Sequence, residues 1–136
     1  MFDVNQVQLE FAFDLLRQTT VNSPTKSVVI CPVAVANSLA MLSCGCRGKT
    51  KNELQNALGY CQDDFNFHFY FHQNAQALRE ESVESMLKIA NRLYVPKEFD
   101  IMHSFQNFAI EKYLDQAHSI DLDSVEEGDT VYQPIC

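Results

Sequence analysis

The chain is short of positive charge and of long apolar runs. Its 136 residues include 10 lysines and arginines against 18 aspartates and glutamates, which gives a formal net charge of −8. This balance opposes binding to the phosphates of nucleic acids and to anionic lipid surfaces, so we expect neither nucleic acid nor membrane as a partner. The longest apolar stretch, residues 31–46, is interrupted by Asn37, Ser38 and Ser43 and is too short to span a bilayer.

Marks of a secreted protein are also missing. The N-terminal segment has neither the basic cluster nor the apolar run of a signal peptide, and no Asn-x-Ser/Thr acceptor occurs anywhere. The cysteines form an odd set without regular spacing: Cys31, Cys44, Cys46, Cys61 and Cys136. Such a set suits reduced thiols. We therefore expect an intracellular, cytosolic protein.

The apolar fraction of 46% predicts a packed core, and the periodicity of the chain predicts both helices and strands. Apolar residues at helical spacing predict helices over residues 3–20, 32–44, 51–58, 65–82 and 101–114. Alternation of apolar and polar residues, or a short β-branched run, predicts strands over residues 27–30, 86–95 and 118–122. Residues 124–136 show no periodicity, and we expect a disordered tail there. The expected fold class is α+β, with one partial domain over residues 1–123.

Three details of these elements are specific enough to test. Residues 32–44 contain no charged residue, so this helix should be buried on nearly every side. Thr50 and Glu53 have the spacing of a capping box and should start the helix over residues 51–58. The phenylalanines of residues 65–72 alternate as in a strand, but the helix-forming residues that follow favour a helix for the whole segment.

Two histidines have the spacing of a chelating pair. His68 and His72 lie one helical turn apart, and two imidazoles so placed can bind a metal ion. Phe69 stands where a zinc protease of this pattern has its glutamate, so that chemistry is excluded. We favour partly buried histidines beside an aromatic core over a metal site, and we expect no cofactor.

The cysteines leave two interpretations open. Cys44 and Cys46 could bind a soft metal or respond to oxidation, particularly if Cys31 or Cys61 folded nearby. Buried free thiols usually behave as small apolar groups, and we favour that role for Cys31 and Cys44. Serine, histidine and aspartate are all present, but no local signature brings a nucleophile and a base together, so we do not expect an enzyme.

Short motifs along the chain occur in a recognisable order. They are Phe11–Arg17, then Ile30-Cys31-Pro32, then Ser38-Leu39-Ala40-Met41 followed by Gly45, Gly48 and Thr50, then Ile89 to Tyr94 with Asn91, then Phe105–Tyr113, and finally Ile120-Asp121-Leu122. In this order they resemble the first helices and the first central-sheet strands of the serpin family of protease inhibitors. The resemblance gives structural roles to Cys31, Pro32, Leu39, Met41, Gly45, Gly48, Thr50, Asn91, Phe105 and Asp121.

The resemblance implies inhibition of serine, and sometimes cysteine, endopeptidases. Serpins inhibit through a reactive loop near their C-terminus, which a protease cleaves and which then inserts into the central sheet. The resemblance places no such loop within these residues, so we expect this incomplete serpin fold to be non-inhibitory by itself. Alternatives are a binding module that associates with an intact serpin through exposed strand edges, or an incomplete gene product. The extracellular space, where many family members act, is the alternative location.

Four positions bear on the comparison with serpins. Serpins usually have serine where Cys31 stands and often where Ala34 stands, near the point at which the central sheet opens. Arg79 is the only fixed cation of residues 65–82, so the polysaccharide binding that some serpins show at this helix is disfavoured. Asn91 shares a strand face with apolar residues and is either a latch in the sheet or a structural hydrogen bond.

Overall fold

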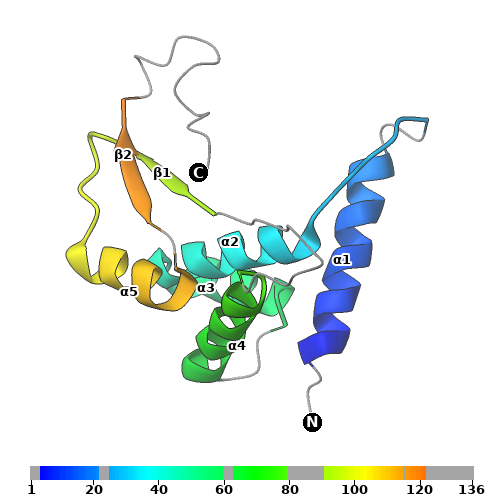
Figure 1. Ribbon diagram of the computed structural model, residues 1–136, viewed down its shortest axis with the longest axis horizontal. Coiled ribbons are helices and arrows are strands. Elements are labelled where there is room, and N and C mark those ends of the chain that lie inside the picture. The colour runs from blue at the N-terminus through cyan, green and yellow to red at the C-terminus, as the bar shows by residue number, and fades with distance from the viewer. Residues whose placement is uncertain (1–3, 22–24, 60–62, 80–90, 115, 122–136) are drawn as a thin grey trace.

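Helices make up most of the structure, which is a computed structural model describing residues 4–21, 25–59, 63–79, 91–114 and 116–121 (Figure 1). Within these residues the helices are α1 (Val4–Val21), α2 (Pro32–Gly45), α3 (Gly48–Ala57), α4 (Asp64–Ala77) and α5 (His103–Tyr113), and the strands are β1 (Leu93–Pro96) and β2 (Ala117–Ile120). The α+β class is confirmed. No helix in the described part of the chain is long and apolar enough to cross a membrane.

Helix α2 lies at the centre and contacts each of the other four helices (Figure 1). Pro32 occupies its first turn, where the missing N–H is not needed. Ala36 and Ala40 are fully buried, because side chains of this size let neighbouring helices come close. The buried core joins α2 to α3, α4 and α5 and consists of Ala36, Ala40, Met41, Leu58, Phe67, Phe71, Ala109 and Tyr113.

The expectation that α2 is buried on nearly every side is wrong for one of its faces. Val35 and Leu42 are each 37% exposed, although the helix carries no charge. They are seven residues apart and therefore share one side of the helix. No element among the described residues covers that side fully.

Helix α3 begins earlier than the capping-box prediction placed it. Its first residue is Gly48, and Arg47 is the N-cap residue without a side-chain capping bond. Thr50 is thus inside the helix and exposed, and Glu53 forms an ion pair with Lys49 at 3.5 Å. Gly48 has a φ of +56°, a conformation that glycine adopts readily, and this allows the chain to turn into the helix three residues sooner.

Helix α4 confirms the helical interpretation of the phenylalanine-rich segment. Asp63 caps it by accepting a hydrogen bond from the main-chain N–H of Phe65 at 2.9 Å. The alternating rings therefore divide between two faces of a helix, with Phe67 and Phe71 buried and Phe65 and Phe69 exposed.

The strand predicted over residues 27–30 is absent. These residues have no regular structure, and Val29 is 99% exposed. A β-branched run forms a strand only when another strand pairs with it, and no described segment pairs with this one. The sequence pattern alone could not reveal that no described strand lies beside these residues.

The remaining strands pair as a parallel ribbon that α5 connects. Leu93 aligns with Ala117 and Pro96 with Ile120. Gln106 of α5 donates a hydrogen bond from Nε2 to the carbonyl of Ala117 at 2.9 Å, which fixes the helix to β2. The described parts of the predicted strands agree with β1 and β2. Residues 86–90, 122 and the predicted tail over 124–136 lie outside the described residues.

Replacement of Gly59 by alanine should destabilise the fold strongly. Its φ is +85°, and an added Cβ would lie 2.8 Å from Cβ of Val7 in α1. We expect Gly59→Ala to lower the free energy of unfolding by about 3 kcal/mol, from backbone strain together with this clash. Urea denaturation measures the change.

Gly48→Ala is the matched control for this test. Gly48 also has a positive φ, but nothing lies within 4 Å of an added Cβ. Gly48→Ala should therefore lower the free energy of unfolding by only about 1 kcal/mol, which is the cost of the backbone conformation. Equal costs for the two variants would show that α1 does not approach Gly59 as described.

Candidate functional site

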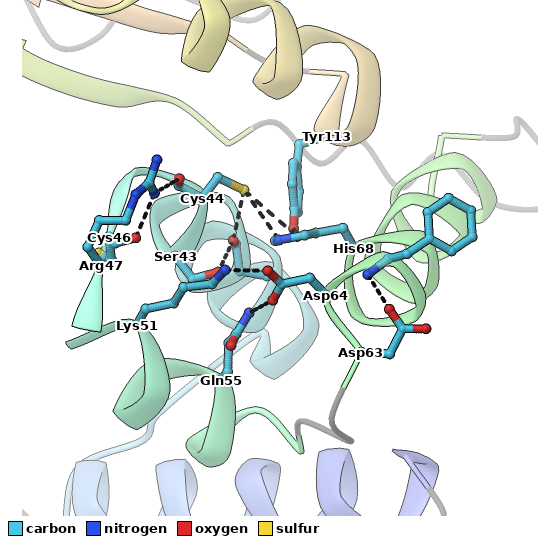
Figure 2. A network of polar contacts seen from close by, with 12 residues as sticks. Ser43, Cys44, Cys46, Arg47, Lys51, Gln55, Asp63, Asp64, His68 and Tyr113 are labelled. Atoms are coloured by element: carbon cyan, nitrogen blue, oxygen red, sulfur yellow. Dashed lines mark hydrogen bonds and ion pairs between the residues drawn. The ribbon is translucent and has the colours of Figure 1, made fainter. Parts of the chain in front are cut away.

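A cluster of polar side chains is enclosed where α2, α3, α4 and α5 meet (Figure 2). His68 of α4 is only 8% exposed, and its Nδ1 lies 2.5 Å from the hydroxyl of Tyr113 in a hydrogen bond. The sulfur of Cys44 lies 3.8 Å from the same nitrogen and 3.5 Å from the carbonyl of Ala40. Side chains from α2, α4 and α5 therefore meet at one point.

An ion pair borders this cluster on the side of α3. Asp64 begins α4, one turn before His68, and its carboxylate pairs with Lys51 of α3 (Figure 2). Gln55, which is buried, donates a hydrogen bond from Nε2 to Oδ1 of Asp64 at 2.7 Å. The bonds from Lys51 and Gln55 lower the pKa of Asp64. The pair thus joins α3 to the start of α4.

Burial keeps the inner members of the cluster uncharged. It lowers the pKa of His68 to about 4, although the nearby carboxylate of Asp64 opposes this shift. Burial also raises the pKa of Cys44 to about 12 and raises the pKa of Tyr113. A thiol that stays protonated is a poor nucleophile and a poor metal ligand. The cluster is therefore suited to holding the helices in register rather than to catalysis.

The two candidate metal ligands both face α5. His72 donates a hydrogen bond from Nδ1 to the main-chain carbonyl of Lys112 at 2.9 Å, while His68 bonds to Tyr113. Among the described residues, no group of three or more histidines, cysteines, aspartates or glutamates is placed to hold a metal ion. Each histidine has its Nδ1 engaged by the neighbouring helix.

A cavity of about 450 Å³ opens beside these histidines, between α4 and α5. Its lining residues are Asp64, Phe65, His68, Phe69, His72, Phe108 and Lys112. We call it the α4–α5 pocket. Sequence reasoning identified the histidines but missed the pocket, because its other wall comes from a helix some forty residues later in the chain.

Asn91 forms a hydrogen bond that links the start of the sheet to α2. The hydroxyl of Ser38 donates to Oδ1 of Asn91 at 2.9 Å. The adjacent Asn37 is 1% exposed, and its side-chain amide has no hydrogen-bond partner among the described residues. It faces a gap of about 10 Å³ that Asn91 and Tyr113 also line. Sequence reasoning singled out Asn91 but not Asn37.

The other motif residues differ in their burial and in their contacts. Met41 lies in the core with Leu39 packed against it, and Gly45 lies against Phe105, whose ring would be 3.3 Å from an added Cβ. Asp121 forms an ion pair with Lys97. The packing role that we favoured for Cys31 is wrong, since this side chain is exposed just before Pro32 begins α2.

Acid should destabilise the chain through His68. The folded-state pKa of about 4 lies below the ordinary value of 6.5, so the unfolded chain binds the proton more readily between these two values. The stabilisation is complete above pH 6.5 and is lost as the pH falls toward 4, by about 3 kcal/mol of unfolding free energy.

Urea denaturation at several pH values tests this prediction. The unfolding free energy of His68→Gln should fall less than that of the parent chain between pH 6.5 and pH 4. Gln76→Ala, at an exposed position of the same helix, should behave as the parent chain, and a parallel decline in all three proteins would contradict the assignment.

Thiol labelling should separate Cys31 from Cys44. Only the thiolate reacts, and Cys44 is partly buried with a raised pKa, whereas Cys31 is exposed. Near neutral pH we expect iodoacetamide to modify Cys31 more than about a hundredfold faster, as measured by peptide mass spectrometry. Unfolding in urea should bring the two rates together. Comparable rates in the folded chain would show that Cys44 is accessible.

Comparison with known proteins gives one consistent family. The family model described as "Serpin (serine protease inhibitor)" matches residues 6–131. Serpin A3-2 of Bos taurus is 31% identical over 111 residues, which cover 79% of this chain and 27% of that protein. The leukocyte elastase inhibitor of Equus caballus is 28% identical over 127 residues, which cover 93% of this chain and 33% of that protein.

A solved structure agrees with these relatives. Thyroxine-binding globulin in complex with thyroxine superposes with a TM-score of 0.80 at 27% identity, covering 88% of this chain and 33% of that one. The chain therefore spans about a quarter to a third of the length of the relatives it matches. With the family model matched over most of its residues, the chain belongs to the serpin family.

Proposed function

We propose that residues 1–123 are the N-terminal part of a serpin domain that inhibits serine endopeptidases, and that the 136-residue polypeptide alone does not inhibit them. The observation that carries this proposal is the parallel pair of β1 and β2 on a base of packed helices, within a chain that the serpin model matches over residues 6–131. The relatives include a leukocyte elastase inhibitor and an α1-antiproteinase. The proposed activity is inhibition rather than catalysis.

The role proposed for this segment is to support the sheet that receives the cleaved reactive loop. In serpins the loop becomes a new strand of the central sheet, so the sheet must move over a base that stays fixed. The enclosed cluster of His68, Tyr113 and Cys44 supports the fixed role of the helices. The bond between Ser38 and Asn91 supports a defined attachment of the sheet to α2. We propose structural roles of this kind for the motif residues.

A chimera would test the proposal directly. The equine leukocyte elastase inhibitor would receive residues 1–121 of this chain in place of its own matching segment and would be incubated with elastase. We expect a complex that resists SDS, because the segment supplies the base and the equine protein supplies the reactive loop. The 136-residue polypeptide alone should give no such complex with trypsin-like, chymotrypsin-like or papain-like proteases.

A variant of the chimera, Ser38→Ala, tests the attachment of the sheet, because it removes the hydroxyl that bonds to Asn91. It should raise the fraction of chimera that elastase cleaves without forming a complex, because a loosely attached sheet inserts the loop less reliably. A folded chimera that elastase only cleaves would contradict the inhibitory proposal and favour a non-inhibitory binder. The relatives also include a corticosteroid-binding globulin, which is 30% identical over 106 residues.

A second candidate function is association with an intact serpin. Its basis is the exposed apolar side of α1, where Leu9, Phe13 and Leu16 are 56%, 63% and 41% exposed. A sheet of two strands is also marginally stable by itself. Size-exclusion chromatography with the equine inhibitor measures such binding. A 136-residue chain that stays monomeric and folded in the mixture would count against it.

We infer a reducing compartment for the protein. The support is the odd cysteine count, together with the free thiols of Cys31, Cys44 and Cys46 in the described residues. An exposed free thiol such as that of Cys31 is poorly suited to an oxidising environment. The cytosol is therefore the proposed location, ahead of the extracellular space.

A further inference from the structure

We propose that the α4–α5 pocket binds a small aromatic carboxylate, with the ring against phenylalanines of both helices and the carboxylate at Lys112. The cavity of about 450 Å³ is within the range of roughly 300–1,000 Å³ that is usual for small-molecule sites. It is lined mainly by aromatic side chains with a few polar groups, which is the usual composition of such sites.

Two aromatic rings of the pocket, those of Phe65 and Phe69, are not explained by core packing. Helix α4 buries Phe67 and Phe71 on the side that faces α2, and these two rings belong to the core. Phe65 and Phe69 lie on another side and are 69% and 46% exposed. Their rings stack nearly parallel, with centroids 6.1 Å apart and an interplanar angle of 9°. Two exposed rings held in parallel offer a flat apolar surface to a ligand.

The opposite wall comes from α5. Phe108 packs edge-on against the imidazole of His68, with ring centroids 5.1 Å apart. The bond from His72 to the carbonyl of Lys112 holds the two helices together at the far end of the pocket. Rings from two helices thus form two walls, and a planar aromatic ligand suits the space between them better than a bulky aliphatic one.

The charges along the pocket favour an anion. At one end Asp64 already pairs with Lys51 and accepts a hydrogen bond from Gln55, so its negative charge is compensated. At the other end Lys112 pairs with Glu111, the next residue in the chain, whose side chain is 68% exposed. An exposed pair of this kind contributes little, so a ligand carboxylate can replace Glu111 at the ammonium group. The carboxylate therefore belongs at the Lys112 end.

Two matched probes test the proposal on the purified full chain. 2-Naphthoate carries the carboxylate, and 2-naphthalenemethanol has the same ring without the charge. In equilibrium titrations we expect both to bind, with the acid about fivefold tighter, as for a half-exposed ion pair. Lys112→Gln should abolish the preference for the acid and leave the affinity for the alcohol unchanged.

Two phenylalanine variants locate the binding site. Phe69→Ser should weaken both probes by about tenfold, because it removes one wall of the pocket. Phe13→Ser changes a ring on α1 that is more exposed than Phe69 and lies away from the pocket, and it should leave both affinities unchanged. All three substitutions are at partly or largely exposed side chains, and circular dichroism checks that the helices are retained.

The outcomes separate the proposal from unspecific binding. Equal affinities of the parent chain for the acid and the alcohol would overturn the role of Lys112. Equal losses in Phe69→Ser and Phe13→Ser would show that the probes bind any exposed ring, and this would overturn the site. Failure of both probes to bind the folded chain would overturn the proposal altogether. None of these results depends on whether the chimera inhibits elastase.

Discussion

The packing of helices against the uncharged helix α2 is the interaction on which the rest of the structure depends. Ala36 and Ala40 are fully buried, and their small side chains leave room for α1, α3, α4 and α5 to contact the same helix. Gly45 continues this pattern at the end of α2, where the ring of Phe105 lies against it. Close packing of this kind is lost when even a methyl group is added, so the sequence of α2 limits what its neighbours can be.

The enclosed polar cluster follows from this packing. Once α3, α4 and α5 pack around the end of α2, His68, Tyr113 and part of Cys44 are removed from water and must bond to one another. Burial makes charged forms costly, and the cluster stays neutral inside while the pair of Asp64 and Lys51 stays near the surface. Such a network adds less to stability than apolar packing does, but it requires one arrangement of the helices.

The sequence predicted the helices well because their signals are local. Apolar residues at helical spacing placed α1, α2, α4 and α5 within a few residues, and the order of short motifs indicated the family. The errors arose where structure depends on partners distant in the chain. The run at residues 27–30 has the composition of a strand but no described partner. The early start of α3 has a local cause instead, because the positive φ of Gly48 begins the helix before Thr50 can cap it.

The candidate site was predictable only in part for the same reason. The spacing of His68 and His72 placed both on one face of a helix, and this is confirmed by their bonds to α5. Their partners, Tyr113 and the carbonyl of Lys112, are about forty residues away, and no local pattern identifies them. Cys31 was assigned to the core from the general tendency of thiols to be buried, but it lies before the first turn of α2 rather than on its packed face.

The described sheet is attached to the helices by both apolar and polar contacts. The helices share a continuous core, and Leu93 of β1 packs against it. Gln106 of α5 also bonds to the carbonyl of Ala117 in β2. The relatives named as inhibitors and those named as binding globulins each match most of this chain at similar identity. Likeness over these residues therefore does not by itself distinguish an inhibitor from a binder.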